Sequence, residues 1–277
     1  MKKLIDVQTQ SVLFFFLFFV INLQAQETWK EVKTISVGKA RLISADSHFN
    51  IYIANESGIV SQYDSLGDKI AFFSPGKKSK VTCLDGSRNV NVFLFYKNFQ
   101  EYKLLNRFLT EISTTRLNHD QIGFVSLATL SPDNALWLLD ESDLALKKLN
   151  SEFNQIIVNS SLLPILPRTK NEFIFTNLRE YNNNLYLSDK SNGIFVFDNL
   201  GNFKTLIPAS DIEHFSFWEN NLYFIESSKL HIINLIRNER RVVEREFPRN
   251  AQIILSRNKA YILHEDKLSV HRHNIIQ

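Results

Sequence analysis

Cysteine, recognisable catalytic motifs and long apolar runs are all scarce in this sequence. Its 277 residues include a single cysteine, Cys83, which excludes an intramolecular disulfide. There is no glycine-rich phosphate loop, no His-Glu-x-x-His pair and no Gly-x-Ser-x-Gly turn. Neither sign of charge dominates, because 32 lysine and arginine residues stand against 29 acidic ones. Bulk charge therefore points to neither nucleic acid nor membrane as a partner.

The longest apolar run, residues 12–23, is shorter than the roughly 20 residues that a membrane-spanning helix needs. It follows a basic start with two lysines and ends just before the small residue Ala25. This order is typical of a secretory signal peptide, so we expect residues 1–25 to be removed and residues 26–277 to form one exported domain, periplasmic or extracellular. Because Leu23 is large for its position before the cleavage site, an uncleaved leader that anchors the protein to the membrane stays open as an alternative.

Residues 184–208 show the pattern on which the rest of the chain is built. Two apolar-rich runs, 185–189 and 194–198, are joined by a short polar turn, and the turn Asn199-Leu200-Gly201-Asn202 leads into a third run. This pattern is typical of antiparallel strands joined by hairpins. Residues 41–74 contain four such strands and make one complete unit.

The unit recurs along the chain. Its second strand begins at one of six positions: Ile51, Val92, Leu136, Leu185, Leu222 and Ala260. Its third strand begins at Ile59, Tyr102, Ala145, Ile194, Leu230 and Leu268. Successive second strands start 41, 44, 49, 37 and 38 residues apart, whereas the third strand starts 8 to 10 residues after the second. Six copies at this period predict a propeller or another repeat array.

Turn chemistry supports the same division of the chain. The third strand ends in Asp or Asn in five units, at Asp64, Asn106, Asn150, Asp198 and Asn234. Such side chains accept hydrogen bonds from the backbone of a tight turn, and Gly67 and Gly201 adopt positive φ freely. We interpret these residues as turn formers and not as ligands.

The last unit supplies only three strands before the chain stops at Gln277, and residues 29–37 form one strand without a hairpin partner. Pairing this strand with residues 268–271 completes the last unit and covers its open edge. We therefore predict an all-β, six-bladed β-propeller whose last blade is closed by the N-terminal strand.

Two runs resemble the NHL-type repeat of six-bladed propellers: Leu185-Tyr186-Leu187-Ser188-Asp189, and Gly193 to Gly201 with its Asp-x-x-Gly turn. The resemblance extends over the chain from Arg41 and is clearest in the first and fourth units. It implies a binding platform or, where metal ligands gather on one face, a hydrolase or lactonase.

Loops at one end of the predicted propeller carry the candidate ligand-binding residues. Four basic residues lie in or beside the loops that lead towards the axis: Arg41, Lys80, Lys170 and Arg249. They predict an anion site at the channel mouth, held by charge-assisted hydrogen bonds. The same end carries acidic hairpins, so a ring of weak, self-neutralising ion pairs is the competing interpretation. The loops that lead towards the axis offer few oxygen ligands for a hard cation, and we expect neither a metal nor a cofactor.

A second candidate is the apolar, proline-containing loop Leu163-Pro164-Ile165-Leu166, which makes a partner contact if it is exposed and otherwise covers one end of the channel. We expect Cys83 to be a buried, unreactive thiol, and His271 and His273 to be solvated. The 23 phenylalanines fit a core between packed blades, which argues against nucleic acid.

These observations favour a monomeric, non-enzymatic binding or scaffolding propeller that takes a protein or peptide partner or a small anionic ligand. Nucleic acid is not expected, and membrane contact is expected only through an uncleaved leader. Two alternatives stay open. One is a hydrolase or lactonase-like enzyme with its site at the channel mouth, and the other is a sensor ectodomain on an uncleaved N-terminal anchor.

Overall fold

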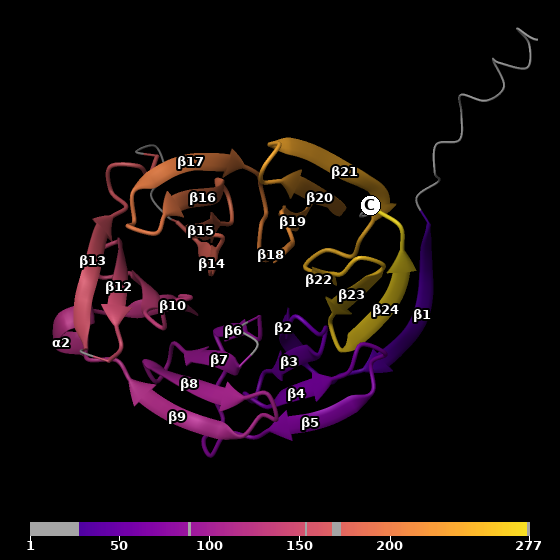
Figure 1. Ribbon diagram of the computed structural model, residues 1–277, viewed down its shortest axis with the longest axis horizontal. Helices are drawn as coiled ribbons and strands as arrows, with labels where there is room; N and C mark the ends of the chain where they lie inside the picture. Colours follow the sequence, from indigo (N-terminus) through magenta and orange to yellow (C-terminus); the bar gives the residue numbers. More distant parts are fainter. Residues whose placement is uncertain (1–27, 88–89, 153, 168–172, 276–277) are drawn as a thin grey trace, which may run out of the picture.

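The computed structural model describes residues 28–87, 90–152, 154–167 and 173–275, which form six antiparallel sheets of four strands each. The sheets stand around a central axis as the blades of a propeller, in sequence order (Figure 1). The predicted all-β, six-bladed fold is confirmed. The predicted signal peptide, residues 1–25, lies outside the described residues. In the described part of the chain no helix is long and apolar enough to cross a membrane.

In every blade the innermost strand is named first and the rim strand last. Blade one contains β2 (Ala40–Ala45), β3 (Ile51–Asn55), β4 (Val60–Tyr63) and β5 (Lys69–Phe73). Blade two contains β6 (Cys83–Asp85), β7 (Asn91–Tyr96), β8 (Glu101–Asn106) and β9 (Glu111–Arg116). Blade three follows the short helix α2 (His119–Ile122) and contains β10 (Val125–Leu130), β11 (Leu136–Asp140), β12 (Ala145–Asn150) and β13 (Gln155–Ser161).

Blade four contains β14 (Phe175–Tyr181), β15 (Asn184–Asp189), β16 (Gly193–Asp198) and β17 (Phe203–Pro208). Blade five contains β18 (Phe215–Trp218), β19 (Asn221–Glu226), β20 (Lys229–Asn234) and β21 (Glu239–Glu246). Blade six contains β22 (Gln252–Leu255), β23 (Lys259–His264), β24 (Lys267–His273) and β1 (Trp29–Ser36). Every second and third strand begins within one residue of its predicted start.

The core lies between blades. All five residues of β11 are buried, whereas the rim strand β13 alternates exposed and half-buried residues. This difference follows from face-to-face packing, because a middle strand has a neighbouring sheet on both sides and a rim strand does not. Phe93 and Phe95 of β7, for example, pack in one cluster with Leu136 and Leu138 of β11 in the next blade.

The turns after the third strands form as predicted. Asp198 Oδ1 accepts hydrogen bonds from the backbone N–H groups of Leu200 (2.9 Å) and Asn202 (2.8 Å). Asp64 accepts the equivalent pair from Leu66 and Asp68 at 2.8 and 2.9 Å. A side-chain oxygen thus replaces a missing backbone partner in each tight turn.

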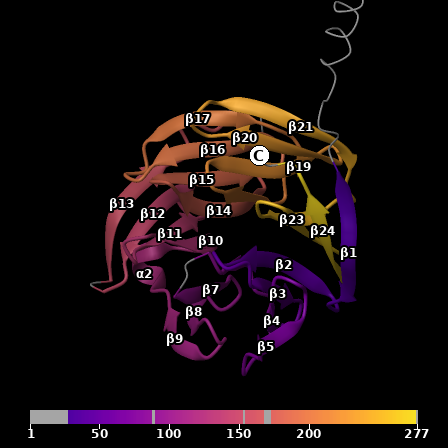
Figure 2. The same ribbon diagram turned by 45° about the vertical axis from the view of Figure 1, so that its right-hand side comes forward.

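Strand β1 closes the ring. It pairs antiparallel with β24, so that Ile35 lies opposite Leu268 and Glu31 opposite His271, and the predicted pairing is confirmed (Figure 2). The Trp29 ring lies 5.5 Å from the Phe247 ring and 5.2 Å from the His273 ring, centroid to centroid.

The expectation of solvated imidazoles in the last strand was wrong. His271 and His273 are only 4% and 5% exposed. Strand β1 and the indole of Trp29 cover them, and this cover could not be foreseen from a position near the end of the chain.

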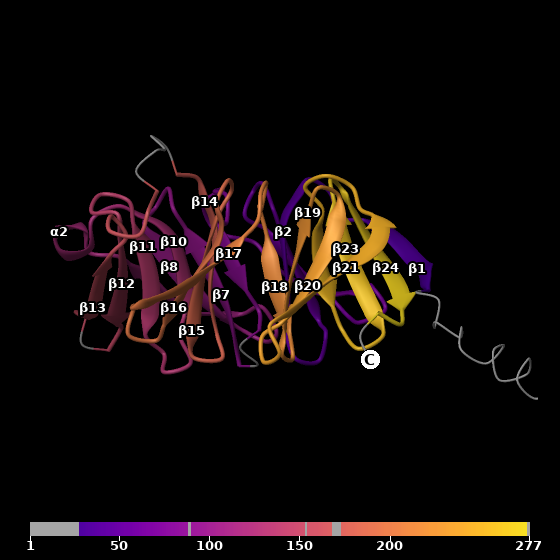
Figure 3. The ribbon, with the colours of Figure 1, turned by 90° about the horizontal axis from the view of Figure 1, so that it is seen from above.

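The disc has two loop-bearing faces (Figure 3). We call the mouth face the one that carries the loops between blades and the hairpins between second and third strands. The opposite face carries the hairpins between first and second strands and between third and fourth strands. This division follows from the alternating direction of the strands and places three of the basic candidates, Arg41, Lys80 and Arg249, on the mouth face.

Candidate functional site

The inner strands of the six blades leave only a small cavity at the central axis, as far as the described residues define it. The cavity left between the inner strands measures about 40 Å³, and Thr129, Asn177, His214 and Gln252 are among the residues that line it. One water molecule takes roughly 30 Å³ in the liquid, whereas ligand pockets usually measure about 300 to 1,000 Å³. The cavity that the described residues enclose in the channel is therefore too small for an organic ligand.

An ion pair crosses this channel. Arg179 of β14 places Nη2 3.2 Å from Asp85 Oδ1 at the end of β6, and the two side chains are 11% and 4% exposed. The same Nη2 donates to Ser87 Oγ at 3.2 Å, while Asp85 Oδ1 also accepts from the Ser87 N–H at 2.8 Å. The channel thus contains its own positive charge, already neutralised by a buried carboxylate.

Three further titratable groups near the channel, His214, Cys83 and Tyr223, are held neutral. Desolvation, followed by the nearby charge of Arg179, lowers the pKa of His214 to about 3. Burial raises the pKa of the Cys83 thiol to about 12, and Cys83 Sγ lies 3.4 Å from the Ala128 N–H as an acceptor. Burial likewise raises the pKa of Tyr223 to about 12. None of these groups is poised for proton transfer or nucleophilic attack near neutral pH.

The basic candidates lie near the channel mouth. Arg41, Lys80 and Arg249 are exposed, and each is within three residues of a side chain that lines the channel cavity. Arg41 Nη1 lies 3.6 Å from Glu56 Oε1, so one predicted member is paired with an acidic hairpin. Lys80 and Arg249 make no ion pair with another described residue. Lys170 lies outside the described residues.

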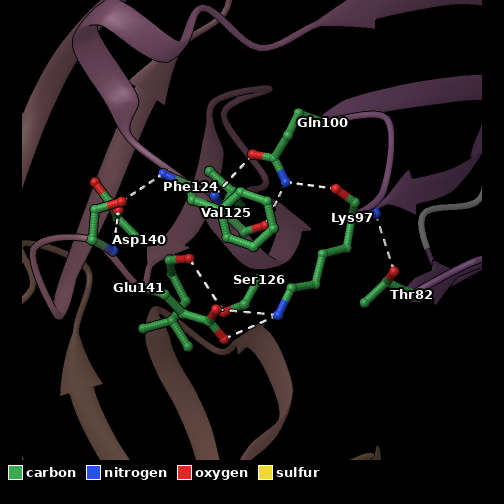
Figure 4. A network of polar contacts seen from close by, with 10 residues as sticks. Thr82, Lys97, Gln100, Phe124, Val125, Ser126, Asp140 and Glu141 are labelled. Carbon is green, nitrogen blue, oxygen red and sulfur yellow. Dashed lines mark hydrogen bonds and ion pairs between the residues drawn. The ribbon is translucent and has the colours of Figure 1, made fainter.

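Neighbouring blades are tied together at the mouth face (Figure 4). Gln100 of blade two donates from Nε2 to the Val125 carbonyl at 2.7 Å, and its Oε1 accepts from the Val125 N–H at 2.8 Å. Nearby, Lys97 Nζ pairs with both oxygens of Glu141 at 3.1 and 3.2 Å and lies 5.2 Å from the Phe124 ring centroid. At least part of the mouth-face charge is therefore self-neutralised.

The apolar loop is divided between core and surface. Leu166 is 7% exposed and packs in the cluster between blades three and four, with Ile165 against it. Leu163, 62% exposed, and Pro164 point outward. Because Leu166 is buried, it cannot take part in a partner contact. The loop covers the junction of two blades and lines neither end of the channel cavity.

A much larger hollow lies on the flank of the ring, and we call it the blade 4/5 groove. It measures about 650 Å³. Blade four supplies Tyr186, Val196 and the β17 residues 204–208, and blade five supplies Ile233, Leu235 and Ile236. Its remaining lining residues are polar: Asn182, Asn184, Asn220, Asn238 and Arg240. This volume lies within the usual range for ligand pockets.

Arg240 forms one wall of the groove and joins the two blades. Its Nη2 lies 2.6 Å from Glu226 Oε2, its Nε donates to His231 Nδ1 at 3.0 Å, and its Nη1 donates to the Pro208 carbonyl at 3.2 Å. The guanidinium also lies 5.4 Å from the Phe224 ring centroid. With all these partners, Arg240 is a fixed structural group.

Sequence reasoning missed both Arg179 and the groove. Arg179 left one signal, a cation that follows Leu178 inside an innermost strand, where apolar or small residues are expected. No sequence pattern indicated the groove, because the distance between two blades is set by the packing of their side chains. Within the described residues, no group of three or more His, Cys, Asp or Glu side chains is placed to hold a metal ion.

Comparison with solved structures places this architecture among β-propellers. Virginiamycin B lyase from Staphylococcus aureus is similar over 88% of this chain and 99% of its own, at 12% identity and a TM-score of 0.63. BamB from Moraxella catarrhalis is similar over 90% and 99%, at 10% identity and a TM-score of 0.52.

The extracellular domain of a protein assigned as a one-component system from B. thetaiotaomicron matches 86% of this chain and 33% of its own, at 11% identity and a TM-score of 0.56. No protein-family model matches the chain. No curated protein matches its sequence either. At these identities the likeness concerns the fold alone.

Proposed function

We propose that this protein is an exported, non-enzymatic propeller that binds a segment of a partner protein in the blade 4/5 groove. The observation that carries the proposal is the volume of the groove, about 650 Å³, against about 450 Å³ for the hollow between blades six and one and about 40 Å³ for the channel cavity. A segment of several residues can enter the groove. In the channel, such a segment could reach the mouth but not the interior.

The character of the groove supports a binding role. Its apolar side chains offer area that leaves water on contact, and its asparagines offer both donors and acceptors. Export is supported by the leader-like residues 1–25 and by the shared fold of BamB and an extracellular domain.

Site-specific photo-crosslinking in the producing cell tests this function. A photoreactive residue in place of Ile236, which is 74% exposed beside the groove, should give one discrete protein adduct. The same residue in place of Ile112, 55% exposed on the rim strand β9 of blade two, is the control and should give none.

Excess purified protein of the natural sequence should abolish the adduct, whereas excess Thr205→Tyr protein, with a bulky side chain in the groove, should not. Equal adducts at both positions, or equal competition by both proteins, would contradict the proposal.

A further inference from the structure

We infer that the occupant of the blade 4/5 groove is an extended, acidic peptide segment, and that Lys204 pairs with its carboxylate. This inference rests on the proposed function and specifies the chemistry of the partner. Three properties of the groove lead to it: its shape, its charge and the distribution of its apolar and amide groups.

The shape of the groove matches an extended chain. Five consecutive residues of β17, from Lys204 to Pro208, line it. Successive side chains of a strand point to opposite faces of the sheet. Five consecutive residues can therefore line one groove only if the backbone edge of the strand also faces that groove. Because β17 is the last strand of its sheet, its outer edge has no strand partner in the described sheets. At about 3.3 Å per residue the run spans about 13 Å, the length of roughly four extended residues.

The charge of the groove selects an acidic segment. Its lining contains two cations, Lys204 and Arg240, and no carboxylate. Arg240 is committed to Glu226, His231 and Pro208. Lys204 Nζ donates to Asn184 Oδ1 at 2.8 Å, which leaves two of its three donors for a ligand. Lys204 is exposed, its charge also acts on the nearby carboxylate of Asp198, and it forms no salt bridge with another described residue.

Apolar side chains and side-chain amides make up most of the remaining lining of the groove. Ile233 and Leu235 supply an aliphatic wall from blade five. The side-chain amides of Asn182, Asn220 and Asn238 face solvent and make no hydrogen bond with another side chain of the described residues. An amide offers one acceptor and two donors and therefore complements the peptide main chain. A segment with alternating aliphatic and acidic residues satisfies both features.

A small free acid would contact fewer of the residues that line the groove than a peptide would. A single exposed lysine pair contributes at most about 1 kcal/mol, and one unshared ammonium cannot hold a small anion tightly. Most of the affinity must then come from contact along the strand, which only a ligand of several residues makes. The groove thus favours a peptide over a sugar acid or a free amino acid.

Fluorescence anisotropy with defined peptides tests the inference. The probe is a fluorescein-labelled, end-blocked hexapeptide in which isoleucine alternates with aspartate, and its counterpart carries asparagine in place of aspartate. We expect the aspartate peptide to bind about fivefold more tightly than the asparagine peptide. Lys204→Gln should remove this preference, and Ile236→Ser should weaken both peptides. Lys30→Gln, on the exposed outer face of β1, is the matched control and should change neither.

Several outcomes would overturn the inference. Equal binding of both peptides, or binding unaffected by Lys204→Gln, would remove acidic specificity. Displacement of the probe by free glutarate as effectively as by unlabelled peptide would assign the site to small acids. If peptide binding fails while Thr205→Tyr still loses competition in the crosslinking experiment, the acidic peptide is wrong but the groove remains the binding site. If both fail, the proposed function falls as well.

Discussion

Asp85 and Arg179 form an ion pair at 3.2 Å across the channel, although blade three lies between the strands that carry them. Because both side chains are almost fully buried, removing one charge leaves the other without compensation. Asp85→Asn keeps the shape and the acceptor for Ser87, and we expect it to lower the free energy of unfolding by about 3 kcal/mol. Urea denaturation followed by tryptophan fluorescence measures the change.

The exposed pair Lys229–Glu244, at 2.8 Å, is the control for this prediction. Lys229→Gln should leave the urea midpoint unchanged, because solvent screens such a pair. If Asp85→Asn were as stable as the natural sequence, the channel pair would have no structural role.

The Gln100 amide should act as a clamp between blades two and three (Figure 4). Gln100→Leu keeps similar volume but leaves the N–H and C=O of Val125 without their partner. We expect a loss of about 2 kcal/mol, the cost of buried polar groups left unpaired. Thermal unfolding measures this loss. Gln62→Leu, a substitution of the same kind, provides the comparison because the Gln62 amide donates to the Tyr52 hydroxyl within blade one and does not join two blades. Equal losses in the two variants would deny Gln100 a special role at the junction.

Deleting residues 29–36 should open blade six. The deletion exposes the edge of β24 and uncovers His271 and His273, so we expect aggregation or a cooperative loss of stability. Size-exclusion chromatography and thermal melting measure these effects. A truncated protein that stays monomeric with unchanged melting would refute the role of β1 in closing the ring.

Acid should weaken the fold below about pH 6.5, the ordinary pKa of histidine. Burial lowers the pKa values of His214, His271 and His273, so the unfolded chain binds protons that the folded chain does not. Stability is therefore complete above this pH and falls as pH drops towards the folded pKa values, by about 1.4 kcal/mol per pH unit for each such histidine. His214→Gln should reduce the slope measured by urea denaturation between pH 6.5 and 4, and an unchanged slope would contradict the assignment.

The anion site at the channel mouth stays a prediction. Replacing Arg41 and Arg249 with Ser should weaken retention on immobilised acidic ligands at low salt and reduce its salt dependence. Because Arg41 already faces Glu56, we expect Arg249→Ser to have the larger effect of the two single variants. Unchanged retention in the double variant would leave these residues as a solvated, self-neutralised surface.

Much of the fold could be predicted because its signals are local. Alternating apolar runs, the turn carboxylate of Asp198 and the spacing of the repeats are all readable within one blade. The ring closure required only counting, since β1 had no other partner.

The site could not be predicted in the same way. Arg179 meets Asp85 only because six blades converge at one axis, and the residues are 94 positions apart in the chain. Lys204 belongs to an ordinary rim strand, and its significance comes from the space left beside it. The size of such a space depends on how two neighbouring sheets pack, and the sequence of one blade describes only one of the two sheets.

We expect the pairing of β1 with β24 to be a late step in folding. Trp29 lies opposite His273, so this contact joins residues separated by nearly the whole domain. Contacts of such long sequence separation form slowly, because the chain loses the entropy of closing a long loop before the contact stabilises the fold. During synthesis, β1 is made before the other strands and stays unpaired until β24, its partner in blade six, has been made. Until then the rim of the incomplete blade is an unpaired edge, and we expect this interval to be when the chain depends most on chaperones.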